Sequence, residues 1–518
     1  MPANAPKTSR HLEVERKFDV GESTVSPSFE GIASVARVEK SPIQSLDAVY
    51  FDTPAHDLAR NKVTLRRRTG GADAGWHLKL PAGPDARTEV RAPLDASDEA
   101  TVPSELLDVV LAIVRDRTVE PVARITTQRE SQVLYGAEGA GLAEFSNDRV
   151  TAWSAGAPGD SDSGPAEQQW HEWELELLET EGATNETADT ELLNRLSNRL
   201  LDAGAAPAGH GSKLARVLGE TSQPNGTQPP ADPLHRAVAE QIDQLLVWDR
   251  AVRADAPDAV HQMRVTIRKI RSLLRDSQDS FGSTDSEWVQ AELRELAGVL
   301  GVARDAEVLG ERYQRQLDLL APELVRGRVR ERLVKGAQRR YQTGLRRSLI
   351  AMRSQRYFHL LDTLDSLVAE TPVPSSGEEP VAVTIDAAYK RVRKAAEAAE
   401  EGAQTGAQSG ESGEHDRDLA LHRIRKRAKR LRYTAAATGA DKVSEQAKVI
   451  QTLLGDHQDS VVSREHLIQQ TEAAQTAGED TFTYGLLFQQ EADLAESCRQ
   501  RLDAALRKLA KAVRKARH

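Results

Sequence analysis

Three charged residues near the N-terminus, Glu13, Glu15 and Lys17, are spaced two positions apart. In an extended strand, side chains two positions apart point to the same face, so two carboxylates and an ammonium group would share one space. Carboxylate oxygens are the ligands that hard divalent cations prefer, and an ammonium group attracts phosphate. The spacing therefore predicts a place where a hydrated divalent cation and a phosphate are held together.

Charged residues alternate in the same way further along the chain, at Arg66/Arg68, Glu89/Arg91 and Glu172/Glu174/Glu176. Strand-like segments rich in alternating or β-branched residues are predicted at 13–20, 46–52, 63–68, 76–80, 88–93, 124–135, 141–152 and 170–178. Eight antiparallel strands can close into a barrel whose interior receives every second side chain. Because those side chains are charged here, we expect a wet interior that holds a charged ligand.

Alternating charges also occur on an ordinary solvent-exposed sheet face, and for any single pair this is the more common explanation. Several segments with the same pattern favour the ligand-binding interior. Acidic pairs at both ends of the region and basic pairs between them form a complementary set.

Taken in order, these motifs resemble the CYTH family, which contains the triphosphate tunnel metalloenzymes: inorganic triphosphatases, thiamine triphosphatases and class IV adenylate cyclases. The resemblance covers roughly residues 10–220. It rests on Glu13-x-Glu15-x-Lys17, Tyr50-Phe51-Asp52-Thr53, Leu65-Arg66-Arg67-Arg68, Lys79, Glu172-x-Glu174-x-Glu176 and Ser212-Lys213.

The resemblance implies a tunnel in which basic residues grip a linear triphosphate and carboxylates hold Mg²⁺ or Mn²⁺. The implied phosphate-binding and catalytic residues are Lys17, Arg66, Arg68, Lys79 and Lys213, with Arg124 or Arg129 as a further cation. The implied metal ligands are Glu13, Glu15, Asp148, Glu172, Glu174 and Glu176. Glu89 is either a metal ligand or a salt-bridge partner. The stretch 154–169 departs from a tight hairpin and is expected to be a loop.

From about residue 232 onward the chain is rich in Ala, Leu, Arg, Glu and Gln with apolar residues at helical spacing, which predicts long helices. Two of these segments repeat one pattern: His261-x-x-Arg264-x-x-x-Arg268-Lys269-x-Arg271 and His422-x-x-Arg425-x-x-x-Lys429-Arg430-x-Arg432. Offsets 0, 3, 7 and 10 lie on one helix face, so each copy presents one histidine and three cations.

A second pair of segments extends the repeat, because Leu300-Gly301 and Leu454-Gly455 are each followed four residues later by an aspartate, Asp305 and Asp459. We interpret each Leu-Gly pair as a helix end. A period near 160 residues indicates a duplicated helical bundle, with the two basic faces expected to line a shared groove.

Basic clusters on helices are more often solvated faces than binding sites. However, 423–432 contains seven basic residues in ten and no acid, and like charges three or four positions apart on a helix repel one another. Because both copies of the motif contain such clusters of cations, we expect an anionic partner. A lone histidine is more often structural than a ligand, so metal binding by His261 or His422 is a weak hypothesis.

The pattern resembles the CHAD domain, the conserved-histidine α-helical domain, over roughly 232–518. That family implies binding of inorganic polyphosphate along a basic surface. The mapped residues are His261, Arg264, Arg268, Lys269, Arg271, Arg275, His422, Arg425, Lys429, Arg430 and Arg432. Nucleic acid is the rival polyanion, but few aromatic residues are present for base stacking and the chain is acidic overall.

Together with the strand and helix patterns, the two resemblances imply an α+β multidomain protein: an eight-stranded antiparallel β-barrel tunnel at 8–220, a linker at 221–232, and an all-α duplicated helical bundle at 233–518 with repeats near 233–370 and 381–518. Residues 1–230 carry 23 basic and 36 acidic side chains, whereas 416–518 carry 19 and 14, so a whole-chain net charge of −10 conceals a basic C-terminal region. The stretches 220–233 and 400–414 are rich in Gly, Pro and Ser, and we treat 400–415 as a loop.

The N-terminal segment lacks the apolar core of a signal peptide, no apolar run is long enough to span a bilayer, and Cys498 is the single cysteine. We therefore expect a cytoplasmic protein without membrane contact. The CHAD resemblance further implies that the protein could associate with polyphosphate granules.

The resulting hypothesis is a metal-dependent triphosphatase acting on inorganic triphosphate or a related linear phosphate and joined to a polyphosphate-binding module. Two alternatives stay open: a non-catalytic polyphosphate scaffold, and adenylate cyclase chemistry in the tunnel.

Overall fold

A computed structural model of the 518-residue chain describes residues 8–94, 101–154, 167–178, 186–219, 232–276, 283–369, 384–406 and 410–516. The chain divides into two compact units, Met1–Glu295 with Leu349–Pro372 and Leu296–Ser348 with Val373–His518. Each unit is described by itself below. The domain limits expected from the sequence stay predictions. Of the stretch 154–169 that was expected to be a loop, residues 155–166 lie outside the described residues, whereas Ser154 and residues 167–169 belong to strands.

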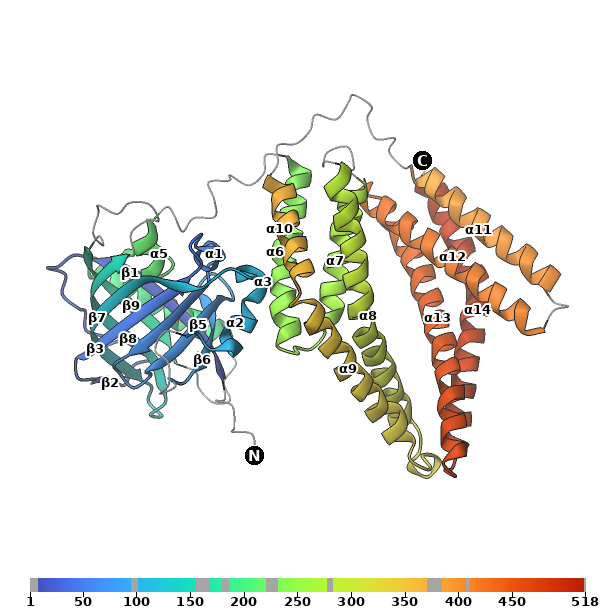
Figure 1. Cartoon of the computed structure of the whole chain (residues 1–518), viewed down its shortest axis with the longest axis horizontal. Helices are drawn as coiled ribbons and strands as arrows, with labels where there is room; N and C mark the ends of the chain where they lie inside the picture. The colour runs from blue at the N-terminus through green and yellow to red at the C-terminus, as the bar shows by residue number, and fades with distance from the viewer. Residues whose placement is uncertain are drawn as a thin grey trace. The chain divides into compact units, whose positions relative to one another are not determined.

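The N-terminal region forms a closed, eight-stranded antiparallel β-barrel, which confirms the predicted fold (Figure 1). Around the barrel the order is β1-β6-β5-β4-β3-β7-β8-β9, and pairing of β9 with β1 closes it. The strands are β1 Ser9–Val20, β3 Gln44–Asp52, β4 Thr64–Thr69, β5 Gly75–Pro81, β6 Ala86–Ala92, β7 Glu120–Tyr135, β8 Gly141–Ser154 and β9 Glu167–Leu177.

Two short strands were not predicted from the sequence. The strand β2 (Arg37–Lys40) pairs with β7, and β10 (Ala206–Pro207) pairs with β1. Both are too short to show a period of two, so only their pairing with longer strands identifies them.

On β8 and β9 the outer face of the barrel is apolar, whereas a second apolar cluster that includes Ile125, Val150 and Trp170 lies on the same strand faces as the interior charges. Phe145 on β8 and Trp173 on β9 are buried and meet edge to face. The helix α4 (Glu186–Asp202) covers them with Leu193, Leu196 and Leu200, which recur every three or four positions. Because helices cover the apolar outer face, the charged alternate positions are left to the interior.

Shorter helices complete the barrel domain: α1 (Asp57–Arg60), α2 (Ser104–Val109), α3 (Leu111–Val114) and α5 (Lys213–Leu218). Ser212 begins α5, and its side-chain oxygen accepts a hydrogen bond from the backbone N–H of Ala215. This capping serine matters for the site because it places Lys213 at the first helical position.

The helical region begins with α6 (Pro233–Arg253), α7 (Ala259–Asp276), α8 (Ser283–Leu319), α9 (Gly336–Ala351) and α10 (Gln355–Ala369), with a 3₁₀ turn at Pro322–Leu324 and a π-helical turn at Glu331–Lys335. Within the first compact unit, α2 and α3 pack against α6. The buried Arg115 donates to Asp362 and Asp365 on α10, and Asp108 accepts from Arg253 on α6.

The second half of the helical region comprises α11 (Ile385–Gly406), α12 (Gly410–Ala437), α13 (Asp441–Thr476) and α14 (Phe482–Ala516). Buried residues at helical spacing, such as Val392, Ile424, Ile450 and Leu509, form its core. The loop expected at 400–415 is wrong in extent, since α11 continues to Gly406 and α12 begins at Gly410.

The predicted helix ends at Leu-Gly are wrong. Both pairs lie inside long helices, α8 and α13, and the glycines are buried. At Gly455 an added Cβ would lie 3.3 Å from a guanidinium nitrogen of Arg425. The glycine therefore permits close packing of α12 on α13 rather than termination of a helix. Among the residues that the structure describes, no helix combines the length and apolar character needed to cross a membrane.

Candidate functional site: a charged pocket inside the barrel

The barrel encloses a pocket of about 600 Å³, part of which is open to solvent. Almost every side chain around it is polar or charged. The lining residues are Glu13, Glu15, Lys17, Tyr50, Thr64, Arg66, Arg68, Asp73, Lys79, Arg87, Glu89, Arg91, Arg129, Glu174, Glu176, Ser212 and Lys213. The pocket thus brings together most of the barrel residues predicted from the sequence.

Strand register explains which charges meet inside the pocket. Directly opposed residues of antiparallel strands share a face, and β1 faces β9 with Lys17 opposite Glu174 and Glu15 opposite Glu176. One pair therefore joins opposite charges, whereas the other sets two carboxylates against each other. The second arrangement is costly unless a cation lies nearby.

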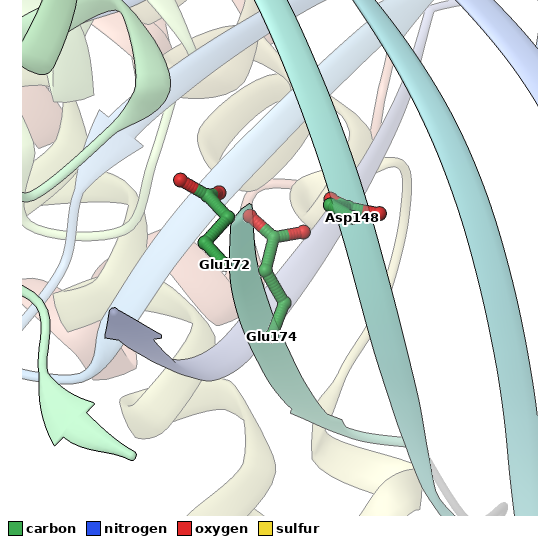
Figure 2. Close-up of side chains that lie close together, drawn as sticks. All are labelled: Asp148, Glu172 and Glu174. Carbon is green, nitrogen blue, oxygen red and sulfur yellow. The ribbon is translucent and has the colours of Figure 1, made fainter. Parts of the chain in front are cut away.

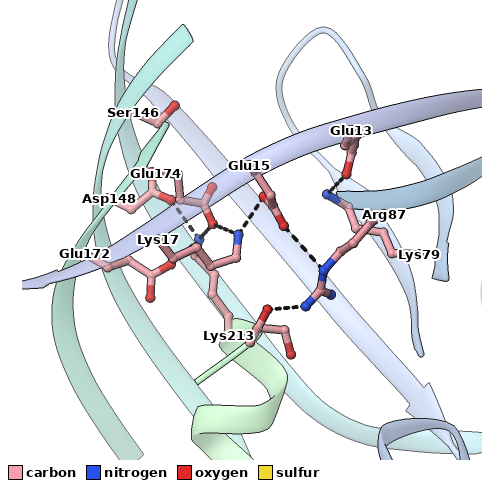
Figure 3. Close-up of polar contacts among 12 residues, drawn as sticks. Glu13, Glu15, Lys17, Lys79, Arg87, Ser146, Asp148, Glu172, Glu174 and Lys213 are labelled. Atoms are coloured by element: carbon pink, nitrogen blue, oxygen red, sulfur yellow. Dashed lines mark hydrogen bonds and ion pairs between the residues drawn. The ribbon is translucent and has the colours of Figure 1, made fainter. Parts of the chain in front are cut away.

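Lys17 joins two strands through its ammonium group, 2.7 Å from Glu15 Oε2 and 2.6 Å from Glu174 Oε1 (Figure 3). Burial alone would raise the pKa of Glu15, but the charges of Lys17 and Lys79 outweigh it and lower the pKa to about 2. Glu15 is therefore ionised at neutral pH.

Three carboxylates, from Asp148 on β8 and from Glu172 and Glu174 on β9, converge with one oxygen of each within 4.8 Å of the others (Figure 2). The Lys213 ammonium nitrogen lies 2.8, 2.6 and 2.8 Å from their respective oxygens. Arg129 adds two hydrogen bonds to Asp148, of 2.8 and 2.6 Å, and a further contact to Glu174. A single ammonium group thus stands at the centre of the acidic trio.

Two further carboxylates of the pocket, Glu13 on β1 and Glu176 on β9, have raised pKa values. Burial raises the pKa of Glu176 to about 7, and Glu13 raises it further while Lys79 opposes the shift. Burial also raises the pKa of Glu13, although the Lys79 ammonium nitrogen is only 2.5 Å from its Oε2. These shifts mark the Glu13–Glu176 side as a place where additional positive charge is favourable.

The carboxylate set fits a hard divalent cation, because Mg²⁺ and Mn²⁺ prefer carboxylate and water oxygens. Asp148, Glu172 and Glu174 form a group that could hold such a cation. For a cation to bind the trio, the ammonium group of Lys213 must leave its centre. The structure supports metal binding by these carboxylates without identifying the metal.

On the opposite wall, cations dominate. Arg66 lies opposite Tyr50 across β3 and β4, with a guanidinium nitrogen 3.4 Å from the phenol oxygen. Burial, Arg66 and Arg129 lower the pKa of Arg68 to about 9, which still leaves this guanidinium charged at neutral pH. Mutual repulsion of buried guanidinium groups makes this wall a receptive surface for a multiply charged anion.

Arg124 is a correction to the predicted site. Its side chain is 60% exposed on the outer surface, where it pairs with Asp47. Because Arg124 and Arg129 are five positions apart on β7, an odd number, a regular strand points them to opposite faces. The interior cation is Arg129.

Several pocket residues were absent from the predicted site. Arg87 and Arg91 on β6 follow the same period of two that identified the other strands, so the signal was present in the sequence. Between them lies Glu89, for which a metal ligand or a salt-bridge partner was expected, and the structure pairs it with Arg91. Burial alone would raise the pKa of Glu89, but its hydrogen bond with His77 and the charge of Lys79 bring it well below its usual range. Asp73 carried no such signal, because it lies in a loop.

The predicted basic stripes of the helical region lie on separate compact units. The first, on α7, comprises His261, Arg264, Arg268, Lys269, Arg271 and Arg275; the second, on α12, comprises His422, Arg425, Lys429, Arg430 and Arg432. Burial lowers the pKa of Arg271, and nearby Arg294 and Arg275 lower it further. Arg294 lies on α8, outside the repeated basic motif, and was therefore missed.

Two arginines of the α12 stripe contact the neighbouring helix α13. Arg425 packs over Gly455, and Arg432 donates to the Gln451 side chain at 3.2 Å. Burial lowers the pKa of His422, with Lys426 and Arg425 contributing, so this histidine favours its neutral form. Its predicted part in polyphosphate binding stays a prediction.

Two family models match the chain: the CYTH domain over residues 11–204 and the CHAD domain over residues 236–468. The chain joins a CYTH domain to a CHAD domain. It is 77% identical over 523 residues to uncharacterised proteins from two Mycobacterium tuberculosis strains, CDC 1551 and H37Rv, with complete coverage of both chains. The CYTH family includes triphosphatases and cyclases, and its members depend on a metal.

Solved structures resemble individual parts of this CYTH–CHAD chain. PptA from Streptomyces chartreusis is 19% identical and matches 54% of this chain and all of its own, with a TM-score of 0.42. The CHAD domain from the plant Ricinus communis is 22% identical and matches 53% of this chain and 90% of its own, with a TM-score of 0.37.

Proposed function

We propose that the CYTH barrel hydrolyses inorganic triphosphate or a related linear phosphate with Mg²⁺ or Mn²⁺, and that the CHAD region binds polyphosphate. The observation that carries the first part is one pocket in which Lys17, Arg66, Arg68, Arg129 and Lys213 face a set of buried carboxylates. A triphosphate needs several fixed cations and a metal, and this pocket offers both kinds of group.

In this proposal the guanidinium groups of Arg66, Arg68 and Arg129 make paired hydrogen bonds to phosphate oxygens, while Lys17 and Lys79 neutralise the remaining charge. Glu13, Glu15 and Glu176, with Asp148, Glu172 and Glu174, hold the cation. A bound metal ion supplies neutralisation of phosphate oxygens and orientation of a water molecule. The chain itself contributes positioning and fixed charge, which are the main requirements of phosphoryl transfer.

Substrate entry exchanges existing ion pairs for new ones. Lys17 and Lys213 both contact Glu174 in the structure, so a cation held by this carboxylate would leave the two ammonium groups more available to phosphate. Metal and triphosphate should therefore bind cooperatively. This exchange gives a physical reason for metal dependence.

For the CHAD region, support comes from the guanidinium cluster of Arg271, Arg275 and Arg294 in the first compact unit. Retained repulsion between guanidinium groups favours a polyanion, and polyphosphate needs charge without base recognition. Such binding would bring the barrel to polymer in the cytoplasm or at polyphosphate granules.

The test of the barrel is phosphate release by the full chain from triphosphate, long-chain polyphosphate, ATP and thiamine triphosphate, with Mg²⁺, Mn²⁺ or chelator. We expect metal-dependent release from triphosphate, and Glu13→Gln or Glu15→Gln to reduce it at least 100-fold (about 2.7 kcal/mol). Glu39→Gln is the matched control, since Glu39 is exposed on β2 and pairs with Arg37 on the surface.

Unfolding temperatures of all three variants separate loss of activity from loss of structure. Absence of turnover with every substrate would leave a non-catalytic scaffold, whereas cyclic nucleotide formation from ATP would favour the cyclase alternative. Full activity in both glutamate variants would remove them from the site.

The test of the CHAD region is retention of the full chain on immobilised polyphosphate across a salt series. We expect weaker retention and a shallower salt dependence when Arg271 and Arg294 are both replaced by Gln. Unchanged retention would exclude this cluster from the binding surface.

A further inference from the structure

A carboxylate from a surface loop lies on one of the pocket's cations. Asp73 is in the connection between β4 and β5, its side chain is 37% exposed, and it forms an ion pair with Arg68, whose side chain is only 8% exposed. Both residues line the pocket. The loop thus reaches inward and covers a guanidinium group that belongs to the barrel wall.

The loop is held in this position through its backbone. The buried imidazole of His77 has Nε2 2.9 Å from the Asp73 carbonyl oxygen. The other ring nitrogen, Nδ1, lies 2.8 Å from Glu89 Oε1, and because the carbonyl and the carboxylate both only accept, a neutral ring donates to one of the two. His77 therefore contacts the backbone of the loop, and this contact does not involve the Asp73 carboxylate.

The start of the loop is also shaped for this position. Gly70 has φ +80°, and a Cβ there would lie 2.2 Å from the Ser45 carbonyl oxygen. Only glycine allows this turn against β3. Residues 70–72 and Ala74 are exposed, so the carboxylate can swing outward without disturbing the barrel strands.

A carboxylate and a phosphate compete for the same guanidinium donors, because each accepts paired N–H hydrogen bonds in one plane. Arg68 is flanked by Arg66 and Arg129, so it lies in the strongest concentration of positive charge on this wall. An anion that reaches Arg68 must displace Asp73 first.

We propose that Asp73 is a built-in competitor for the anion at Arg68 and sets how much negative charge a ligand needs to enter this end of the pocket. The inference rests on the proposed function, since it takes the ligand to be a linear phosphate. It adds a specificity-determining residue that lies outside the strands carrying the other pocket residues.

The test is titration calorimetry of the full chain with inorganic triphosphate and no divalent metal, comparing wild type with Asp73→Asn. Freed of its competitor, the variant should bind triphosphate about five- to tenfold more tightly, and the gain should shrink at high salt. Asp47→Asn is the matched control, because it breaks an aspartate–arginine pair on the outer surface of the same barrel. Melting temperatures of both variants verify folding.

Equal affinity in wild type and Asp73→Asn would refute the competitor, and weaker binding by the variant would show that Asp73 instead orients Arg68 for the ligand. Either result leaves the proposed hydrolysis intact. If no form binds triphosphate without metal, the competitor is refuted, and the phosphate-release assay with Mg²⁺ or Mn²⁺ remains the separate test of the proposed ligand class. Since chemistry is suppressed by leaving out metal, loss of turnover alone cannot produce any of these outcomes.

Discussion

Replacement of Lys213 by methionine gives the sharpest test of the electrostatics inside the barrel. The substitution keeps an unbranched side chain of similar length and preserves the capping Ser212, but it removes the ammonium group from among Asp148, Glu172 and Glu174. Arg129 then remains paired with Asp148 and Glu174, and Lys17 with Glu174. The buried trio becomes strongly under-neutralised.

The size of the effect follows from burial. Lys213 is 8% exposed, and removal of one partner from a buried ion pair costs about 3–5 kcal/mol. For a domain of this size each kcal/mol lowers the melting temperature by roughly 2–4 °C, so we expect a decrease of about 6–20 °C in chelator. A divalent cation that occupies the trio should return much of this loss, about 2.7 kcal/mol at a hundredfold excess over its Kd.

The assay is thermal unfolding followed by circular dichroism in chelator and in Mg²⁺ or Mn²⁺. Arg124→Met is the control, because its pair with Asp47 is on the surface and contributes at most about 1 kcal/mol. We expect metal to stabilise Lys213→Met more than wild type. Equal stabilisation of the two proteins, or wild-type stability of the variant in chelator, would refute the assignment of the trio as a cation site.

Two further predictions concern pH and packing. Because the folded-state pKa of Glu176 is raised to about 7 from an ordinary value of 4.5, its contribution to stability is complete below pH 4.5 and is lost as pH rises to 7. Glu176→Gln should therefore lose less stability than wild type over that interval in urea titrations with chelator, and parallel curves would contradict the raised pKa. Gly344→Ala should lower the unfolding free energy by about 1–3 kcal/mol, since its Cβ would lie 2.6 Å from the Ala303 backbone nitrogen. The control is Gly298→Ala on α8, where an added Cβ meets nothing within 4 Å, and this variant should keep its unfolding free energy. If both variants lose the same unfolding free energy in urea, close packing at Gly344 is not the cause.

Much of the barrel was predictable because strand faces follow from counting. Glu13, Glu15 and Lys17 share a face by their spacing alone, and the structure places all three along the pocket. The same counting separates Arg124 from Arg129, although the sequence analysis kept both. The residues Arg87 and Arg91 could have been added on the same grounds.

The helical region was predictable in type and less so in detail. Apolar spacing predicted long helices, and the repeat located α7 and α12 correctly. The helix ends at Leu-Gly failed because a glycine inside a helix can serve close packing, as Gly455 does beneath Arg425. A glycine can end a helix or allow another helix to pack closely against it. Which of the two occurs depends on the position of the second helix, which the local sequence does not reveal.

The sequence by itself determined the strand faces, the helical repeat and the kinds of charge in the pocket, since these depend on the local periods of 2 and 3.6 residues. Only the tertiary structure decided which charges meet. Closure of the barrel sets Lys17 against Glu174, the start of α5 inserts Lys213 among three carboxylates, and a loop returns Asp73 to Arg68. These contacts join segments far apart in the chain, where register and loop geometry, rather than periodicity, determine distance.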